Sequence, residues 1–179
     1  MAKKVAVIVG SLQANSMNRR LAHALARLAE GKLEFNILKV DDVPLFNQDL
    51  EANLPAPVAR FKAEVEAADA VLFVTPEYNR SIPGVLKNLI DWGSRPYGKG
   101  SWGGKPAGIV GTTPGAVGTA AAQQDLRKLL TIFNMRLMGQ SEVYLQTTPG
   151  LIADDHSVSN ERTRTFLQGY VDTFTAFIG

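Results

Sequence analysis

The sequence predicts an α/β fold in which a parallel β-sheet lies between layers of helices. Segments rich in Val, Ile and Phe alternate along the chain with segments of helical periodicity, which is the order of parallel β-α units. The strand-like segments are apolar nearly throughout, as in strands that are covered on both faces. Because crossovers between parallel strands are right-handed, helices are expected on both faces of the sheet.

Each predicted strand is a short apolar run that ends at turn-forming residues. Residues 70–75 are apolar up to Thr75, so this strand is expected at the centre of the sheet. The fifth strand is expected to be broken into two pieces. The predicted strands are residues 4–9, 35–38, 70–75 and 107–111, followed by 135–138 together with 143–145.

The predicted helices carry apolar residues at the spacing of one helix face. In the first helix, Leu21, Leu25 and Leu28 form this stripe after a capping residue, which is Ser16 or Asn18. The second helix is expected to open at a proline in its first turn. The remaining helices are expected to begin at residue 57 and to include residues 85–92, 126–133 and 160–178.

Composition restricts the class of protein. The 179 residues, 45% hydrophobic and 20% charged, have the proportions of one soluble domain that covers residues 1–179. The absence of cysteine excludes disulfide frameworks, zinc fingers, iron–sulfur clusters and thiol catalysis. A net charge of +2 is unlike that of a nucleic-acid-binding protein. No signal peptide or membrane-spanning run is present, so we expect a cytoplasmic protein without a membrane partner.

Three loops are expected to form the functional site, because ligands of open α/β sheets bind outside the carboxyl ends of the strands. They are residues 10–18, 76–83 and 111–118. The third is rich in glycine, which lets backbone approach a ligand closely, although glycine-rich turns of this kind are common.

The first loop is suited to a phosphate group. Ser11, Ser16 and Asn18 precede a helix, where hydroxyl and backbone N–H groups converge on an anion. The alternative is an N-cap with spare serines. A P-loop is excluded because Gly103-Gly-Lys105 is followed by proline, and the dinucleotide motif G-x-G-x-x-G is absent.

The second loop is suited to a planar heterocycle such as a flavin. It holds two prolines, Tyr78 and several polar side chains at the end of the central strand, so rigid backbone lies beside a flat ring. In the alternative interpretation, Pro76 and Pro83 shape a turn and Glu77 caps a helix.

Together these motifs resemble one family. The motifs are Gly10-Ser11 with Ser16 and Asn18, Pro-Glu-Tyr-Asn at 76–79, Ser-Ile-Pro-Gly at 81–84 and Lys-Asn-x-Ile-Asp-Trp at 87–92. In this combination the sequence is similar to the NADPH-dependent FMN reductases, especially their chromate and quinone reductase branch. The resemblance implies a flavodoxin-like three-layer sandwich with a five-stranded parallel sheet in the order 2-1-3-4-5. It also implies noncovalent FMN, reduction by NADH or NADPH, and electron transfer to quinones, chromate, azo compounds or similar acceptors by a ping-pong mechanism.

The resemblance also implies roles for individual residues. Two positions depart from it, because many relatives have Arg where this chain has Gln13, and often Tyr where it has Arg80. The FMN phosphate is assigned to Ser11, Gln13, Ser16, Met17 and Asn18. The ribityl chain and ring are assigned to Pro76, Glu77, Tyr78, Asn79 and Ser81, with Thr112, Thr113 and Gly115 on the other side of the ring. Arg80, near the ring, is assigned to NAD(P)H or an anionic acceptor. Arg95 is assigned to the same ligands from its place alone, because it follows the third helix and opens the glycine-rich segment.

No other side chain is needed for the chemistry, because a flavin carries it. Arg95 is equally well interpreted as a solvated surface residue. His23 and His156 lie far apart in the sequence without the spacing of metal ligands, so no metal site is predicted. A Ser-His-Asp hydrolase is excluded because G-x-S-x-G is absent.

Two alternatives remain open. A flavodoxin-like electron carrier would hold FMN without turning over pyridine nucleotide, but such carriers tend to be strongly acidic and this chain has a net charge of +2. A flavin reductase would release reduced FMN to a partner, and only kinetics separates it from a quinone reductase.

A homodimer or homotetramer is expected. Relatives are usually dimers or tetramers, and the glycine-rich segment 95–105 is poorly suited to close the ring site alone. Trp102, Tyr97 and Met138 are predicted to be exposed and available to a neighbouring subunit.

Overall fold

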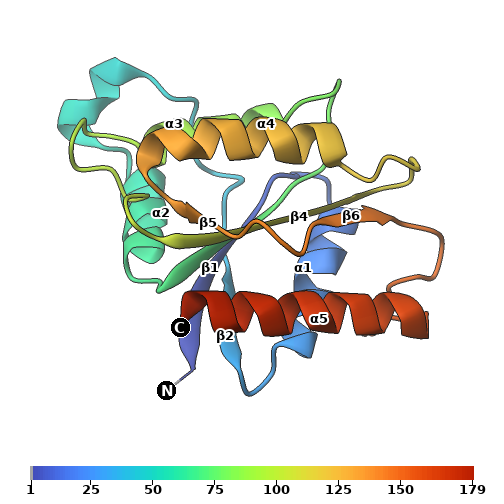
Figure 1. The fold of residues 1–179 in the computed structure, drawn as a ribbon. Helices are drawn as coiled ribbons and strands as arrows, with labels where there is room; N and C mark the ends of the chain where they lie inside the picture. The colour runs from blue at the N-terminus through green and yellow to red at the C-terminus, as the bar shows by residue number, and fades with distance from the viewer. Residues whose placement is uncertain (1) are drawn as a thin grey trace.

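The computed structural model describes residues 2–179 as a parallel sheet between two helical layers. The strand order is β2-β1-β3-β4-β5, with β6 also paired to β4. Helices α1 and α5 cover one face, and α3 and α4 cover the other (Figure 1). The predicted fold class and strand order are confirmed.

The strands follow the predicted apolar runs closely. The expected break in the fifth strand is real, because β5 pairs with Pro106 and Ala107 of β4, whereas β6 pairs with the opposite end of β4, from Val110 to Thr113. The sheet therefore has six strands. Their bounds are β1 Lys3–Val9, β2 Leu33–Ile37, β3 Ala70–Val74, β4 Pro106–Thr113, β5 Arg136–Leu137 and β6 Val143–Gln146.

The helices begin at the predicted signals. Ser16 caps α1 through its Oγ, which accepts from the Arg19 N–H at 3.2 Å, and Pro57 lies in the first turn of α2. The fourth helix is shorter than predicted, because residues 131–133 form a separate 3-10 turn. The bounds are α1 Met17–Leu28, η1 Gln48–Asn53, α2 Ala56–Glu66, α3 Gly84–Gly93, α4 Ala120–Leu130, η2 Thr131–Phe133 and α5 Glu161–Ile178.

Two of the three residues predicted to be exposed are buried. Trp102 is 1% exposed and Met138 is 3% exposed, whereas Tyr97 is 91% exposed. The Trp102 indole lies against Gly93, where a Cβ atom would come within 2.2 Å of the ring, and its Nε1 donates to the Ile90 carbonyl at 3.0 Å. The prediction for Trp102 was wrong because glycine on α3 leaves room for the ring.

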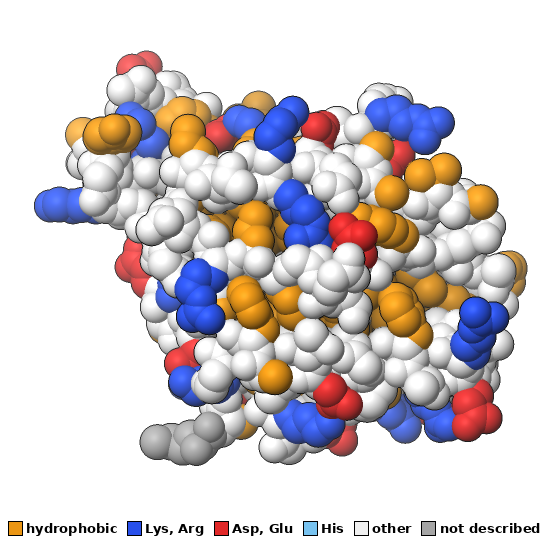
Figure 2. All heavy atoms as spheres, viewed as in Figure 1, with side chains coloured by type: hydrophobic (Ala, Val, Ile, Leu, Met, Phe, Trp, Pro, Cys, Tyr) orange, Lys and Arg blue, Asp and Glu red, His pale blue; other side chains and the backbone are white. Residues whose placement is uncertain are grey.

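The visible face of the molecule mixes charges of both signs. Figure 2 shows hydrophobic side chains exposed between them along the middle of this face, over β5 and β6. In the part of the chain that the structure describes, no helix has the length and apolar character needed to cross a bilayer.

The strand order indicates where a ligand site is expected. The chain passes from β1 to β2 on one side of β1 and then returns to β3 on the other side, so the order reverses between β1 and β3. The crevice at such a reversal is the usual ligand site of open α/β sheets. The loops that follow β1, β3 and β4 surround it.

Candidate functional site

Three predicted loops meet at one edge of the sheet, as expected for the carboxyl ends of parallel strands. The Gly10 N–H donates to the Val74 carbonyl and the Thr75 N–H donates to the Val110 carbonyl, both at 2.9 Å. These bonds hold the ends of β1, β3 and β4 in register, so the loops that follow them start side by side.

The first loop has the donors that a phosphate needs. From Ser11 to Asn18, no backbone N–H donates a hydrogen bond within residues 2–179. The loop ends at the N-terminus of α1, whose first turn holds no acidic residue. Unpaired N–H groups and the positive end of a helix dipole together favour an anion. The phosphate group of FMN therefore fits this loop.

The predicted phosphate residues differ in their surroundings. Ser11 and Ser16 are buried, with 4% and 2% of their surface exposed, and Gln13 is exposed. Met17 lines a cavity of about 300 Å³ beside the loop. Asn18 is 3% exposed, and both atoms of its side-chain amide bond to the backbone of Thr112. Asn18 therefore joins the first loop to the third.

The second loop forms a tight two-residue turn. The backbone groups of Tyr78 and Ser81 exchange hydrogen bonds at 3.0 Å in both directions. Asn79 and Arg80 between them have φ values of 52° and 67°, as in a type I′ turn. Tyr78 is 53% exposed, so its ring is free to cover a ligand.

Two side chains of the second loop are bonded to α4. The Glu77 Oε2 accepts from the N–H groups of Ala121 and Ala122 at 3.0 and 3.2 Å, so it caps α4, whereas the helix that follows the second loop is α3. The Ser81 Oγ donates to Asp125 at 2.8 Å, and this bond lowers the pKa of the Asp125 carboxyl. These contacts fix the loop that follows β3.

The third segment, residues 111–118, begins as strand and not as loop, because β4 continues to Thr113 where it pairs with β6. This segment needs glycine at its start. A Cβ atom on Gly111 would lie 2.1 Å from the Thr119 Oγ1, whereas one on Gly115 would meet nothing closer than 4.0 Å. Gly111 is therefore a packing residue, and Gly115 leaves backbone open to a ligand. The Thr112 Oγ1 donates to the Leu145 carbonyl at 2.9 Å, while Thr113 accepts from the Gly115 N–H.

The two arginines assigned to NAD(P)H differ in exposure. The Arg80 side chain is 76% exposed and lies 3.6 Å from the Glu77 carboxylate. The Arg95 Nε donates to the Glu51 Oε1 at 2.6 Å, and both side chains are less than one quarter exposed. Arg95 is therefore a paired side chain and not simply a solvated one. Glu51 lies in η1, between β2 and α2.

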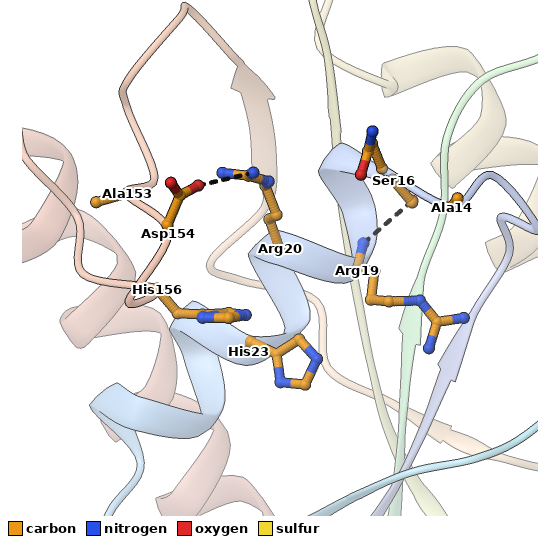
Figure 3. Close-up of a pocket in the computed structure, with 9 residues that line it drawn as sticks. Ala14, Ser16, Arg19, Arg20, His23, Ala153, Asp154 and His156 are labelled. Atoms are coloured by element: carbon orange, nitrogen blue, oxygen red, sulfur yellow. Dashed lines mark hydrogen bonds and ion pairs between the residues drawn. The ribbon is translucent and has the colours of Figure 1, made fainter.

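The structure brings together two histidines that the sequence separates. The rings of His23 on α1 and His156 after β6 lie 4.5 Å apart between centroids. They line a small pocket with Arg19, Arg20 and Asp154 (Figure 3). Between residues 2 and 179, no group of three or more His, Cys, Asp or Glu residues is arranged to hold a metal ion.

Comparison with known proteins identifies the family. The sequence profile described as NADPH-dependent FMN reductase matches residues 3–150. The chain belongs to this family. The family's FMN and NAD(P)H dependence confirms the predicted enzyme class and cofactors, and the free N–H groups of the first loop are consistent with FMN.

Curated relatives of this FMN reductase cover nearly the whole chain. A 2-hydroxy-1,4-benzoquinone reductase from a Burkholderia species is 45% identical over 99% of this chain and 97% of its own length. A quinone reductase from Pseudomonas putida is 47% identical over 97% of this chain and 94% of its own length.

Solved structures agree with the fold. The flavoenzyme NAD(P)H:(acceptor) oxidoreductase FerB from Paracoccus denitrificans superposes with a TM-score of 0.96 at 49% identity, over 99% of this chain and 97% of that chain. A WrbA-like flavodoxin from Agrobacterium tumefaciens matches with a TM-score of 0.62 at 20% identity, over 98% of this chain and 99% of that chain. The flavodoxin-like fold is therefore confirmed.

Proposed function

We propose that this FMN reductase is an NAD(P)H:quinone reductase that uses bound FMN. The observation that carries the proposal is the first loop, where backbone N–H groups from Ser11 to Asn18 are free at a helix N-terminus. The names of two relatives that align along nearly their whole length support quinones as acceptors. Chromate and azo compounds are proposed as further acceptors.

The proposed FMN site spans the three loops. The phosphate lies against the first loop, with Ser11, Ser16 and the backbone of Met17 as donors. Asn18 positions that loop through its bonds to Thr112. The ring and ribityl chain lie between residues 76–81 and 112–115, where Tyr78 is exposed at the turn. The site belongs to one domain of residues 1–179, in a cytoplasmic homodimer or homotetramer.

The proposed role of the protein is to hold FMN, the electron donor and the acceptor in position. Bound FMN supplies two-electron chemistry, with hydride accepted from a nicotinamide and electrons passed to an acceptor. The chain's own residues hold the phosphate, fix the ring's edge and leave one ring face open. Donor and acceptor then bind in turn at that face, which predicts ping-pong kinetics. Arg80 and Arg95 are proposed to contact the phosphates of NAD(P)H.

The visible spectrum of the FMN-loaded protein tests the proposal. Under anaerobic conditions, NADPH is expected to bleach the flavin bands, and benzoquinone is expected to restore them. Bleaching without restoration by quinone would contradict a quinone reductase. Bands that NADPH and NADH both leave unchanged would indicate an electron carrier. Loss of all flavin on desalting, with turnover of added FMN, would indicate that FMN is a substrate.

A further inference from the structure

A basic pocket lies beside the first loop, between the start of α1 and the segment that follows β6. It is a pocket of about 180 Å³, and none of the assigned FMN ring residues lines it. Its walls are the start of α1 and a short turn at residues 153–156 (Figure 3). The lining residues are Ala14, Asn15, Ser16, Arg19, Arg20, His23, Ala153, Asp154 and His156.

Two arginines supply permanent positive charge. The Arg19 guanidinium makes no ion pair or hydrogen bond with any residue from 2 to 179. Arg20 donates to the Ile152 carbonyl at 3.3 Å and to the Asp154 carboxylate at 2.9 Å. The Asp154 side chain is 95% exposed, so this ion pair is screened by water and is readily replaced by a competing anion.

Two histidines add positive charge that depends on pH. Their rings meet edge to face, with an angle of 76° between the planes, and Figure 3 shows the His156 ring reaching from its turn toward the His23 ring. The turn is closed by hydrogen bonds from His156 to Ala153 and from Ala153 to Ser157, each 2.9 Å. His156 therefore has a fixed position, with φ at 66°.

The basic groups outnumber the acidic ones. Two arginines against the single carboxylate of Asp154 leave one net positive charge, which rises to three when both histidines are protonated. Burial, followed by the charges of His156 and Arg19, lowers the pKa of His23. The neighbouring Asp155 pairs with Arg27 at 3.1 Å and does not line the pocket. The cluster therefore keeps one positive charge that the Asp154 carboxylate does not balance.

We propose that this pocket binds a phosphate-type dianion, such as the 2′-phosphate of NADPH or free inorganic phosphate. The volume admits one such group, and guanidinium and imidazole N–H groups are donors that phosphate oxygens accept from. A bound dianion would relieve the mutual repulsion of the histidines and Arg19. The pocket shares Ser16 with the proposed FMN phosphate loop, but its basic side chains, on α1 and in the turn at residues 153–156, are not among the residues assigned to FMN.

Nuclear magnetic resonance of the FMN-loaded protein tests binding without any turnover. The chain has two histidines, so every imidazole C2–H signal reports on this pocket. Sulfate, which stays a dianion between about pH 5 and 8, is expected to shift both histidine signals and to raise the pKa of His23, because a bound anion stabilises the protonated ring. Binding should strengthen as the pH falls, because protonated histidines attract the anion.

Two variants locate the site. Arg19→Gln and His156→Gln are each expected to weaken sulfate binding about tenfold. The matched control is Arg162→Gln, because Arg162 is exposed on α5 and forms no ion pair within residues 2–179. The proposal is overturned if sulfate leaves the wild-type histidine signals unmoved, or if the control weakens binding as much as Arg19→Gln.

Steady-state kinetics separates the two sources of phosphate. If the ligand is the 2′-phosphate, His156→Gln raises the KM for NADPH about tenfold and leaves the KM for NADH and both kcat values unchanged. If sulfate binds but the two KM values change equally or not at all, the ligand is free phosphate. Because the sulfate titration needs no activity, it stands even if the proposed quinone reductase function fails.

Discussion

The side-chain amide of Asn18 is bonded twice to the backbone of Thr112. Its Nδ2 donates to the Thr112 carbonyl at 2.9 Å, and its Oδ1 accepts from the Thr112 N–H at 3.0 Å. Both residues are buried, at 3% and 1% exposure. One side chain therefore fixes the distance between the first and third loops, which the proposed FMN site spans.

Asn18→Ala is expected to reduce both stability and FMN affinity. Two buried backbone groups lose their partner, at roughly 1–3 kcal/mol each, which lowers the free energy of unfolding by about 2–6 kcal/mol. Denaturant unfolding and FMN titration measure the two effects. The control is Asn88→Ala, which removes two comparable bonds, to Phe46 and Pro44, away from the loops. Equal FMN affinity in both variants would contradict a special role for Asn18.

Ser16→Ala is expected to weaken FMN without affecting riboflavin. Ser16 caps α1 and offers a hydroxyl to the phosphate, so FMN should lose about 1–3 kcal/mol of binding. Riboflavin has no phosphate and should bind equally to both proteins. Fluorescence titration of each flavin measures this. Asn160→Ala removes the cap of α5 as a control, and a matching loss of FMN affinity there would point to stability alone.

Gln13→Arg is expected to tighten FMN binding. Gln13 is exposed on the loop of free N–H groups, and an arginine there would add a cation opposite the phosphate. The gain should shrink between about 0.02 M and 0.5 M salt, because the added charge is screened. Gln13→Glu should show the opposite change. Equal dissociation constants for all three proteins at low salt would mean that the side chain at 13 points away.

Local signals in the sequence were sufficient to predict the fold and the features that lie within one loop. Val and Ile runs located the strands, and a serine before a leucine stripe located the α1 cap. Contacts between distant segments carry no such signal. Asn18 and Thr112 lie 94 positions apart, so the sequence indicated a polar residue in a loop but not that its amide is already occupied. The same holds for the bond between Ser81 and Asp125.

The sequence also did not predict that Trp102 is buried, and the reason lies in its packing. Trp102 lies in a segment whose composition predicts exposure, but its ring occupies the space that a side chain on Gly93 would fill. Gly93 is the last residue of α3, where glycine is common for other reasons, so the sequence did not indicate that this glycine makes room for a ring.

The pH dependence of stability should include a contribution from His23. Its pKa is lowered in the folded protein, mainly by burial, so the folded state binds the proton less tightly than the unfolded state. Stability is therefore full above about pH 6.5 and is lost as the pH falls through the lower folded value. His23→Gln should flatten this part of the unfolding profile. Sulfate should flatten it in the wild type if the dianion site exists.

The last prediction concerns assembly. Trp102 and Met138 are buried and are no longer candidates for a subunit contact, but Tyr97 and Ile132 are 91% and 80% exposed. Single large apolar side chains on a surface are common, so these two do not show where a second subunit binds. The stronger reason to expect a subunit contact is Arg80, which projects from a rigid turn beside Tyr78 at the proposed ring site, with 76% of its side chain exposed.

Arg80→Glu is expected to weaken the homodimer or homotetramer and to slow turnover together. The reversed charge would stand beside Glu77 and where the ring, the nicotinamide phosphates and a neighbouring subunit are proposed to meet. Light scattering measures the oligomeric state, and NADPH–quinone kinetics measures turnover. Arg162→Glu, at an exposed position of α5, is the control for the change in net charge. A monomer at micromolar concentration with full wild-type activity would contradict the shared site, because each chain would then form a complete site alone.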